Sequence, residues 1–376
     1  MKRDEAIRLL RRHHEALNRH HVRDLMTMYA DNAVVISPMF RTVSGRAAIG
    51  RSFEQLFTLF PDFQIGRDDA LFVHEHNRIA EFSTVTATHS AELFGLPPTG
   101  HRLEYQAVRL FTFREQQIVH EHRMYDFVGL LERLEKVRAE RELTLAANIQ
   151  RTLLPRTRQE GAYFEAVGTS LPCRTIGGDF FEYVELPNRD FGIAIGDVSG
   201  KGPAAALIAA MLQGMFSMVA EAGGQLSDTL ARVNRALVRR AMEPRFATLV
   251  YGVLAADGRF SYANAGHTPP FLLTRDGARR LSEGGPMLGV FETAAFPSET
   301  LTLRPGETFV AFSDGVTEAF GVDAEQFGEN RLLACATAHS AAAPAELLEA
   351  LVAEVRQFSS KTPQSDDLTI VVLRYR

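Results

Sequence analysis

The sequence predicts an α+β protein made of two units joined by one long helix. Residues 1–126 contain helical periodicity followed by alternating strands, and residues 127–154 form an unbroken helical pattern. Residues 155–376 contain apolar strands that end at aspartates. A chain of 376 residues is too long for one typical domain and suits two domains with a connector. We therefore expect domains at 1–126 and 155–376, with a connecting helix at 127–154.

The first unit begins with helices and continues as strands. Residues 4–18 show helical periodicity, and a second short helix is expected at 22–29. The first helix carries Ile7, Leu10, His14 and Leu17 along one face. Alternating segments predict strands at 33–37, 78–89, 102–113 and 117–125. Helices followed by a long antiparallel sheet predict a curved α+β cone.

The connector is rich in Leu, Glu, Arg and Ala. It has no glycine after Gly129 and no proline before Pro155, which predicts one continuous helix of about 25 residues. One apolar stripe consists of Leu130, Leu131, Leu134 and Val137, and a second of Leu145, Ile149 and Leu153. The charged segment 138–142 interrupts the seam. The simplest expectation is an imperfect coiled coil, and hence a homodimer.

Aspartates stand at the ends of apolar strands in the second unit. Asp197 ends Gly-Ile-Ala-Ile-Gly-Asp, Asp314 follows Phe-Val-Ala-Phe-Ser, and Asp366-Asp367 precede Leu-Thr-Ile-Val-Val-Leu. Asp179 follows two glycines. Taken singly, each aspartate is equally well read as an N-cap or a turn residue. Together they predict a carboxylate cluster whose repulsion a hard cation such as magnesium or manganese offsets.

Seven segments between about Leu145 and Arg376 resemble, in family order, the SpoIIE-like branch of the metal-dependent serine/threonine protein phosphatases. They are Ile149-Gln150 with Leu153-Leu154-Pro155, Gly177-Gly-Asp-Phe180, Asp197-Val-Ser-Gly-Lys-Gly202, Ala265-Gly-His-Thr-Pro-Pro270, Gly284-Gly-Pro-Met-Leu-Gly289, Ser313-Asp-Gly-Val-Thr-Glu318 and Asp366-Asp-Leu-Thr369. The resemblance implies two packed antiparallel sheets with helices on both outer faces, an α-β-β-α sandwich. It also implies a binuclear manganese or magnesium centre. The typical substrates of this branch are phosphorylated anti-sigma-factor antagonists.

The resemblance assigns roles residue by residue. Asp197 is expected to bridge both metals, and a hydroxide formed from metal-bound water is expected to attack phosphorus. Asp179 is expected to bind one metal, and Asp314 and Asp367 the other. The complete expected ligand set is Asp179, Asp197, the carbonyl oxygen of Val198, Asp314 and one of Asp366 and Asp367, with Asp367 favoured.

For five residues near these aspartates, the sequence either leaves a catalytic role open or argues against one. Glu182 stands where the family usually has Asp and is left outside the ligand set. His267 is either a general acid or a structural strand-end residue, with the structural role favoured. Lys201 either contacts substrate phosphate or is solvated, and Arg174 is a candidate phosphate contact. Ser199 is a turn residue and no nucleophile, because no His-Asp pair flanks it.

The first unit resembles the SnoaL-like polyketide cyclase group of the nuclear-transport-factor-2-like superfamily. The matching segments are 29–35, 45–46, 60–62, 88–89 and 97–100. This resemblance implies an apolar pocket inside the cone. Asp126 falls near the position of a proton-transferring acid, and His89 and His101 are candidates to line the pocket. We favour the alternative that the domain senses a small molecule or dimerises, because this fold serves many roles.

The composition and charge of the chain indicate which kinds of partner and which cellular compartment to expect. The formal net charge of −5 gives no electrostatic case for nucleic acid or acidic membranes. Two cysteines, Cys173 and Cys335, suit a reducing cytoplasm. The chain starts with a charged amphipathic helix and not a signal sequence. The most apolar run, 204–218, is interrupted by glycine and shorter than a membrane span.

These observations predict a cytoplasmic signalling phosphatase, regulated through its N-terminal domain, that hydrolyses phosphoserine or phosphothreonine on a regulatory protein. Two alternatives remain. One is a small-molecule cyclase or isomerase in the N-terminal pocket with a regulatory C-terminal domain. The other is a degenerate phosphatase that only binds phosphoproteins, which the complete set of aspartates disfavours.

Overall fold

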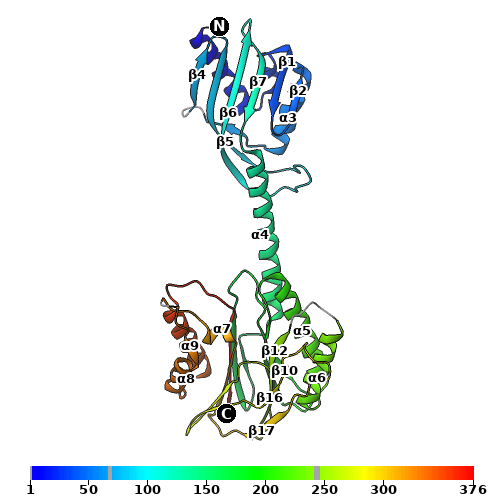
Figure 1. Cartoon of the computed structure of the whole chain (residues 1–376), viewed down its shortest axis with the longest axis vertical. Helices are drawn as coiled ribbons and strands as arrows, with labels where there is room; N and C mark the ends of the chain where they lie inside the picture. Colours follow the sequence, from blue (N-terminus) through cyan, green and yellow to red (C-terminus); the bar gives the residue numbers. More distant parts are fainter. Residues whose placement is uncertain (1, 67–69, 241–245, 323) are drawn as a thin grey trace. The chain divides into compact units, whose positions relative to one another are not determined.

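The computed structural model describes residues 2–66, 70–240, 246–322 and 324–376. The chain divides into two compact units, Met1–Glu142 and Leu143–Arg376. The division falls inside α4 (Phe127–Leu153), a single helix as the sequence predicts (Figure 1). The first part of α4 therefore belongs to the N-terminal unit and its last three turns to the C-terminal unit.

The N-terminal unit packs helices against one seven-stranded sheet of order β2-β1-β7-β6-β5-β3, with β4 added on β5. Leu10, Phe53 and Phe111 are almost fully buried and belong to one core. The elements are α1 (Arg3–Asn18), α2 (Val22–Met26), β1 (Tyr29–Ser37), β2 (Arg41–Ser44), α3 (Arg46–Leu59), β3 (Gln64–Ile65), β4 (Leu71–Glu75), β5 (Arg78–Thr88), β6 (Arg102–Arg114) and β7 (Gln117–Met124). The fold is thus α+β, as the sequence predicts.

Two local predictions for this unit were wrong. The sheet is mixed, because β1 runs parallel to β7 whereas the sequence suggested antiparallel pairing throughout. Parallel neighbours need a long crossover, and here β2, α3 and the strands β3–β6 supply it. The second helix also ends at Met26, and the chain is already extended at Tyr29.

The two apolar stripes of α4 have different surroundings. Leu130 and Leu134 are at most 4% exposed and pack in the N-terminal core. By contrast, Leu145, Ile149 and Leu153 are 62%, 57% and 47% exposed. Two residues of the first stripe are therefore buried and its Leu131 and Val137 are half-buried, whereas the second stripe is exposed and free to contact another helix.

The C-terminal unit is a sandwich of two six-stranded sheets. One has the order β10-β11-β12-β13-β16 with β17 on β13, and the other β15-β14-β18-β19-β9-β8. The strands are β8 (Arg158–Glu160), β9 (Phe164–Leu171), β10 (Phe180–Glu185), β11 (Phe191–Val198), β12 (Ala247–Leu254), β13 (Arg259–Ala265), β14 (Phe271–Thr274), β15 (Gly277–Arg280), β16 (Gly284–Gly285), β17 (Ser298–Thr302), β18 (Thr308–Phe312) and β19 (Leu368–Tyr375).

Helices cover both outer faces of this sandwich, which confirms the predicted α-β-β-α architecture (Figure 1). On one side α5 (Pro203–Glu221) and α6 (Leu226–Arg239) pack on the β10–β13 sheet. On the other side α8 (Gly328–Ala338) and α9 (Pro344–Phe358) pack on the β18–β19–β9 sheet. The short helix α7 (Asp314–Thr317) follows β18 directly. Phe181, Phe260 and Phe309 fill the layer between the sheets.

Helix α5 is longer than the apolar run seen in the sequence. By length and composition alone, it is the one helix in the described ranges that would suffice to cross a membrane. Its face bearing Ala205, Leu212 and Phe216 is fully buried in the core beneath β10 and β11. That burial is what a helix covering one face of a sheet requires.

Candidate metal centre

The two sheets bring five aspartates to one end of the sandwich. Asp179 directly precedes β10, and Asp197 lies at the end of β11. Asp314 opens α7 after β18, while Asp366 and Asp367 directly precede β19. Strands β10 and β11 are antiparallel neighbours, and so are β18 and β19. The start of one strand therefore lies beside the end of the next, and each sheet carries its aspartates at one end of its strands. The strand-end pattern in the sequence thus becomes a cluster in space.

The turn before Asp179 wraps closely around Asp367. The Gly178 N–H donates to Oδ2 of Asp367 at 2.6 Å, and the Cys173 N–H donates to Oδ1 at 2.7 Å. A Cβ on Gly177 would lie 2.4 Å from Oδ2 of Asp367, and one on Gly178 would lie 2.8 Å from the Val198 carbonyl oxygen. Both positions therefore require glycine, and the tight turn holds Asp179 beside Val198.

The carboxylates of the cluster repel one another. Asp179 is 5% exposed, and its Oδ2 has no hydrogen-bond partner among the described residues. Burial and the charge of Asp197 raise the pKa of Asp179 well above its ordinary value. Burial and the charge of Asp314 raise the pKa of Asp197 to about 7, and burial and Asp366 raise the pKa of Asp314. Such a donor set, rich in anionic oxygen, fits hard divalent cations.

One lysine partly offsets the negative charge. Lys201 Nζ lies 2.8 Å from Oδ2 of Asp366 and donates to the Ser365 carbonyl at 2.5 Å. It is therefore held by the cluster and not merely solvated. Arg174 is exposed and lies beside the Gly202 turn, where its guanidinium is 3.9 Å from an ideal Cβ on that glycine.

His267 is fixed at both ring nitrogens. Nε2 lies 3.1 Å from the Phe312 carbonyl and must donate to it, so Nδ1 accepts from the Thr248 hydroxyl at 2.7 Å. Burial lowers the pKa of His267 to about 4. Thr248 pairs with Asp197 across β11 and β12, and Phe312 ends the strand before Asp314. A neutral His267 thus connects the two sheets just behind the cluster, which agrees with the structural role favoured from the sequence.

Glu182 faces away from the cluster. Its Oε2 accepts hydrogen bonds from Gln213 at 2.8 Å and Ser217 at 3.2 Å, both on α5. Gln213 also donates to the Leu153 carbonyl at the end of α4. Glu182 therefore links β10, α5 and α4, which agrees with its exclusion from the ligand set.

Sequence reasoning assigned no role to Gln150. Its side-chain Nε2 donates to the Gly177 carbonyl at 2.7 Å, and its Oε1 accepts the Gly177 N–H at 3.2 Å. The last turns of α4 are therefore hydrogen-bonded to the backbone of Gly177, two residues before Asp179. The signal was present in the sequence, because Gln150 belongs to a family-like segment, but only the fold reveals its partner.

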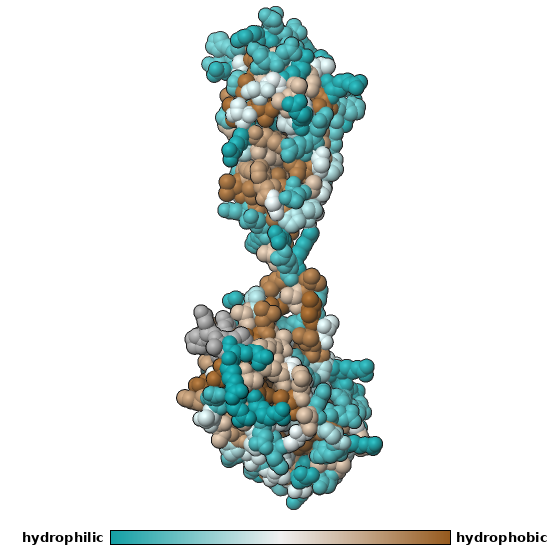
Figure 2. Space-filling view, turned by 90° about the vertical axis from the view of Figure 1, so that its right-hand side faces the viewer, coloured by the Kyte–Doolittle hydropathy of each residue, from teal (hydrophilic) through white to brown (hydrophobic). Residues whose placement is uncertain are grey.

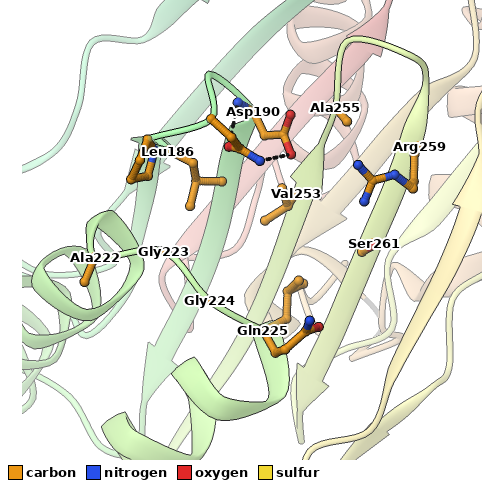
Figure 3. A pocket seen from close by; sticks show the side chains of 13 residues that line it. Leu186, Asp190, Ala222, Gly223, Gly224, Gln225, Val253, Ala255, Arg259 and Ser261 are labelled. Atoms are coloured by element: carbon orange, nitrogen blue, oxygen red, sulfur yellow. Dashed lines mark hydrogen bonds between the residues drawn. The ribbon is translucent and has the colours of Figure 1, made fainter.

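A large cavity of the C-terminal unit lies away from this cluster. It measures about 610 Å³ and is lined by Pro187, Asp190, Gly223, Gln225 and Arg259, among others (Figure 3). Pro187 follows β10, Asp190 precedes β11, and Arg259 begins β13, while Gly223 and Gln225 lie between α5 and α6. The aspartates lie instead at the start of β10 and the end of β11. The cavity is therefore at the opposite end of the sheet. Its Asn188 and Asp190 hydrogen-bond each other, and no acidic cluster is described there.

The predicted N-terminal site residues do not line the interior cavity of the cone. Asp126 is exposed, and its Oδ1 accepts the Gly129 N–H at 2.9 Å, so it caps α4. His89 is buried beside Thr99, and His101 is half-buried. The cavity lining includes Arg109 and Arg123 instead, so the pocket is not the purely apolar one expected.

Comparison with known proteins identifies both units. The family model described as stage II sporulation protein E (SpoIIE) matches residues 187–376, and the SnoaL-like polyketide cyclase model matches residues 7–134. Protein IcfG of Synechocystis is 30% identical over 265 residues, covering 62% of this chain and 41% of its own. Phosphoserine phosphatase RsbU of Bacillus subtilis is 32% identical over 180 residues, covering 47% and 53%.

The fold also matches a solved structure. The SiaA-PP2C domain of Pseudomonas aeruginosa aligns with a TM-score of 0.58 at 23% identity, covering 64% of this chain and 98% of that domain. At this identity the likeness concerns the fold alone. This chain spans about half the length of the curated relatives it matches.

Proposed function

The chain belongs to the SpoIIE family, and from this premise we propose that it is a metal-dependent phosphatase acting on phosphoserine or phosphothreonine of a regulatory protein. The observation that carries the proposal is the cluster of mutually repelling aspartates, in which a buried oxygen of Asp179 has no hydrogen-bond partner among the residues that the structure describes. Burying uncompensated carboxylates is costly, so a fold that gathers them needs a cation to be at its most stable.

We assign the residues that would hold two divalent cations as follows. Asp197 would bridge them, with the Val198 carbonyl as a further oxygen ligand, because both lie where β11 meets the Gly178 turn. Asp179 would hold one cation and Asp314 the other. Bound there, the cations would supply Lewis acidity and lower the pKa of a coordinated water.

Asp366 and Asp367 differ in their hydrogen bonds. Both oxygens of Asp367 already accept backbone N–H groups, and its side chain is 5% exposed. Asp366 is half-buried, and after burial its charge is the main cause of the raised pKa of Asp314. We therefore favour Asp366 as the partner of Asp314 in holding the cation and Asp367 as the residue that fixes the Gly178 turn, which reverses our preference from sequence.

The exposed side of the cluster determines how a substrate would approach. Asp197, Asp314 and Asp366 are half-buried, whereas Asp179 and Asp367 are buried. A phosphorylated side chain would therefore enter over the half-buried three. Lys201, already beside Asp366, would attract its phosphate. We assign no general-acid role to His267, because both of its ring nitrogens are hydrogen-bonded to Thr248 and Phe312.

The contacts of α4 support regulation through this helix. Gln150 makes two hydrogen bonds with the backbone of Gly177. Gln213 donates hydrogen bonds to both the Leu153 carbonyl and the Glu182 carboxylate. A rotation of the last turns of α4 would therefore pull on the turn that carries Asp179. The apolar surface around these turns and α5 is visible in Figure 2. We propose that Leu145, Ile149 and Leu153 pair with a second copy of the chain.

The proposed setting follows from the relatives. RsbU and RsbP of Bacillus subtilis are phosphoserine phosphatases, and we propose a comparable phosphoprotein substrate here, such as an anti-sigma-factor antagonist, in the cytoplasm. The rival function, cyclase chemistry in the N-terminal unit, is disfavoured by the position of Asp126. That side chain is exposed and caps α4.

Phosphate release from a phosphoserine peptide tests this proposal. We expect the full chain to release phosphate with manganese or magnesium and to lose that activity on chelation, with recovery on adding the ion back. A rate that is unchanged by chelation would contradict the metal-dependent mechanism. A chain that binds manganese yet releases no phosphate would support the degenerate, phosphoprotein-binding alternative.

A further inference from the structure

Two buried arginines lie directly opposite each other in the N-terminal sheet. Arg109 of β6 is the register partner of Arg123 of β7, and their side chains are only 5% and 12% exposed. Like charges directly opposite each other on one sheet face destabilise the pairing. Both side chains also line the interior cavity of the cone. Such a pair needs negative charge close by.

Two glutamates supply one negative charge for each arginine: Glu81 on the neighbouring strand β5, and Glu121 on β7, two residues before Arg123. Arg109 Nη2 donates to Glu81 at 2.6 and 2.9 Å, and it lies 2.6 Å from Nε2 of His14. Arg123 donates from Nε and Nη2 to the two oxygens of Glu121 at 2.8 and 3.0 Å. Burial would raise the pKa of each glutamate, but the arginines hold both pKa values low.

The glutamates do not use every donor. Arg109 Nε is buried and has no hydrogen-bond partner among the described residues. A buried, unpaired donor of a charged group carries a substantial free-energy cost. The donor belongs to a side chain that lines the cavity, and an acceptor inside the cavity would remove this cost.

The cavity also limits the size of its occupant. Its volume is about 40 Å³, well below the roughly 150 Å³ of an apolar cavity that binds benzene. An aromatic ring therefore does not fit, but a group somewhat larger than one water does. Apart from the arginines, the lining is apolar or phenolic: Leu17, Phe53, Leu56, Phe63, Ile65, Val85, Tyr105, Ala107 and Tyr125.

We propose that this cavity is a binding site for a short-chain aliphatic monocarboxylate. The carboxylate lies between Arg109 and Arg123, and the short tail lies against the apolar wall that includes Leu56, Phe63 and Val85. Two guanidinium groups give a carboxylate charge-assisted hydrogen bonds. This binding is independent of the phosphatase activity proposed above, so either can fail without the other.

Calorimetric titration of the full chain with propionate tests the site, with propionamide as the neutral isostere. We expect saturable binding of propionate and none of propionamide at the same concentration. Equal binding of both compounds would overturn the role of the arginines. Absence of saturation below about 10 mM propionate would overturn the site itself.

Two variants locate the binding. Arg123→Lys keeps the charge but removes the planar fork, and we expect it to weaken propionate binding about tenfold. Val85→Phe fills the cavity without changing any charge, and we expect it to abolish binding. The control Leu71→Ala, at a 61% exposed position on β4 outside the cavity, should bind like the wild type. Undiminished binding by a folded Val85→Phe protein would show that propionate binds elsewhere.

Discussion

The buried glutamates of the N-terminal sheet and the aspartate cluster of the C-terminal domain differ in how their negative charge is compensated. In the N-terminal domain an arginine contacts each buried glutamate, and the pKa of Glu121 falls to about 2 although burial alone would raise it. In the C-terminal domain the pKa of Asp197 rises to about 7, because burial and further aspartates act in the same direction. A buried carboxylate is therefore not in itself the mark of a metal site. What marks the site is a cluster whose charge the protein leaves uncompensated.

The largest effect is expected from breaking the uncompensated cluster at its centre. Asp197→Asn should lower turnover of a phosphoserine peptide by more than 100-fold, since even residues behind metal ligands typically contribute 10–100-fold. Glu182→Gln is the matched control on the neighbouring strand, and its effect should stay below about tenfold because Glu182 bonds to α5. Equal losses in the two variants would mean that the ligand set is wrongly assigned.

Neutralising one carboxylate in each domain should change stability in opposite directions. Glu81→Gln leaves Arg109 buried without its counter-charge and should destabilise the N-terminal domain by about 3 kcal/mol. Asp179→Asn removes repulsion and should leave the metal-free C-terminal domain at least as stable as the wild type. Denaturant unfolding in the presence of a chelator measures both changes. A large loss in Asp179→Asn would show that its charge is already compensated.

The two domains should also respond oppositely to pH. A raised pKa, as in Asp197, gives stability that is complete below the ordinary value of 3.8 and is lost as pH rises through about 7. A lowered pKa, as in Glu121, gives stability that is complete above 4.5 and is lost as pH falls towards 2. His267, whose pKa burial lowers from 6.5 to about 4, is mostly neutral in both the folded and the unfolded state above pH 6.5. Without metal, raising the pH from 6.5 to 8 should therefore lower the melting temperature of the C-terminal domain only. Calorimetric melting with a chelator measures this shift, and saturating manganese should abolish it; a pH-independent transition would refute it.

A smaller effect, several-fold in turnover, is expected from the last turns of α4. Ile149→Asp places a charge in the exposed apolar stripe, and Gln150→Ala removes the two hydrogen bonds to Gly177. Because misplacing a reacting group by about 1 Å can reduce a rate on the order of 100-fold, a partial shift of the Asp179 turn should be measurable. Asn148→Ala, exposed on the same helical turn, is the control. Wild-type turnover in all three variants would mean that the helix connects the two units without influencing the site.

Dimerisation is the companion test of the same stripe. Each of Leu145, Ile149 and Leu153 that becomes buried between two copies contributes on the order of 1.5–3 kcal/mol. Light scattering of the full chain at micromolar concentration should therefore give a dimer, and Ile149→Asp should weaken it. A monomeric wild-type chain would remove this part of the proposal.

The sequence predicted what depends on local pattern. The α4 helix follows from its lack of proline and of any glycine after Gly129, and the strand-end aspartates follow from motifs of a few residues each. It did not predict features that depend on partners far along the chain. Alternation assigns Arg109 to one face of its strand but does not show that Arg123 is its neighbour. Likewise, the hydrogen bonds at the two ring nitrogens of His267 connect residues from two different sheets.

Manganese binding to the metal-free full chain at pH 7 tests the central claim most directly. Titration calorimetry in buffers of different ionisation enthalpy counts both the ions bound and the protons released. The account predicts two ions per chain, and release of protons, because raised pKa values keep part of the Asp179 and Asp197 population protonated without metal. Asp197→Asn should lose this binding. Wild-type manganese binding in that variant, or binding without proton release, would contradict the account.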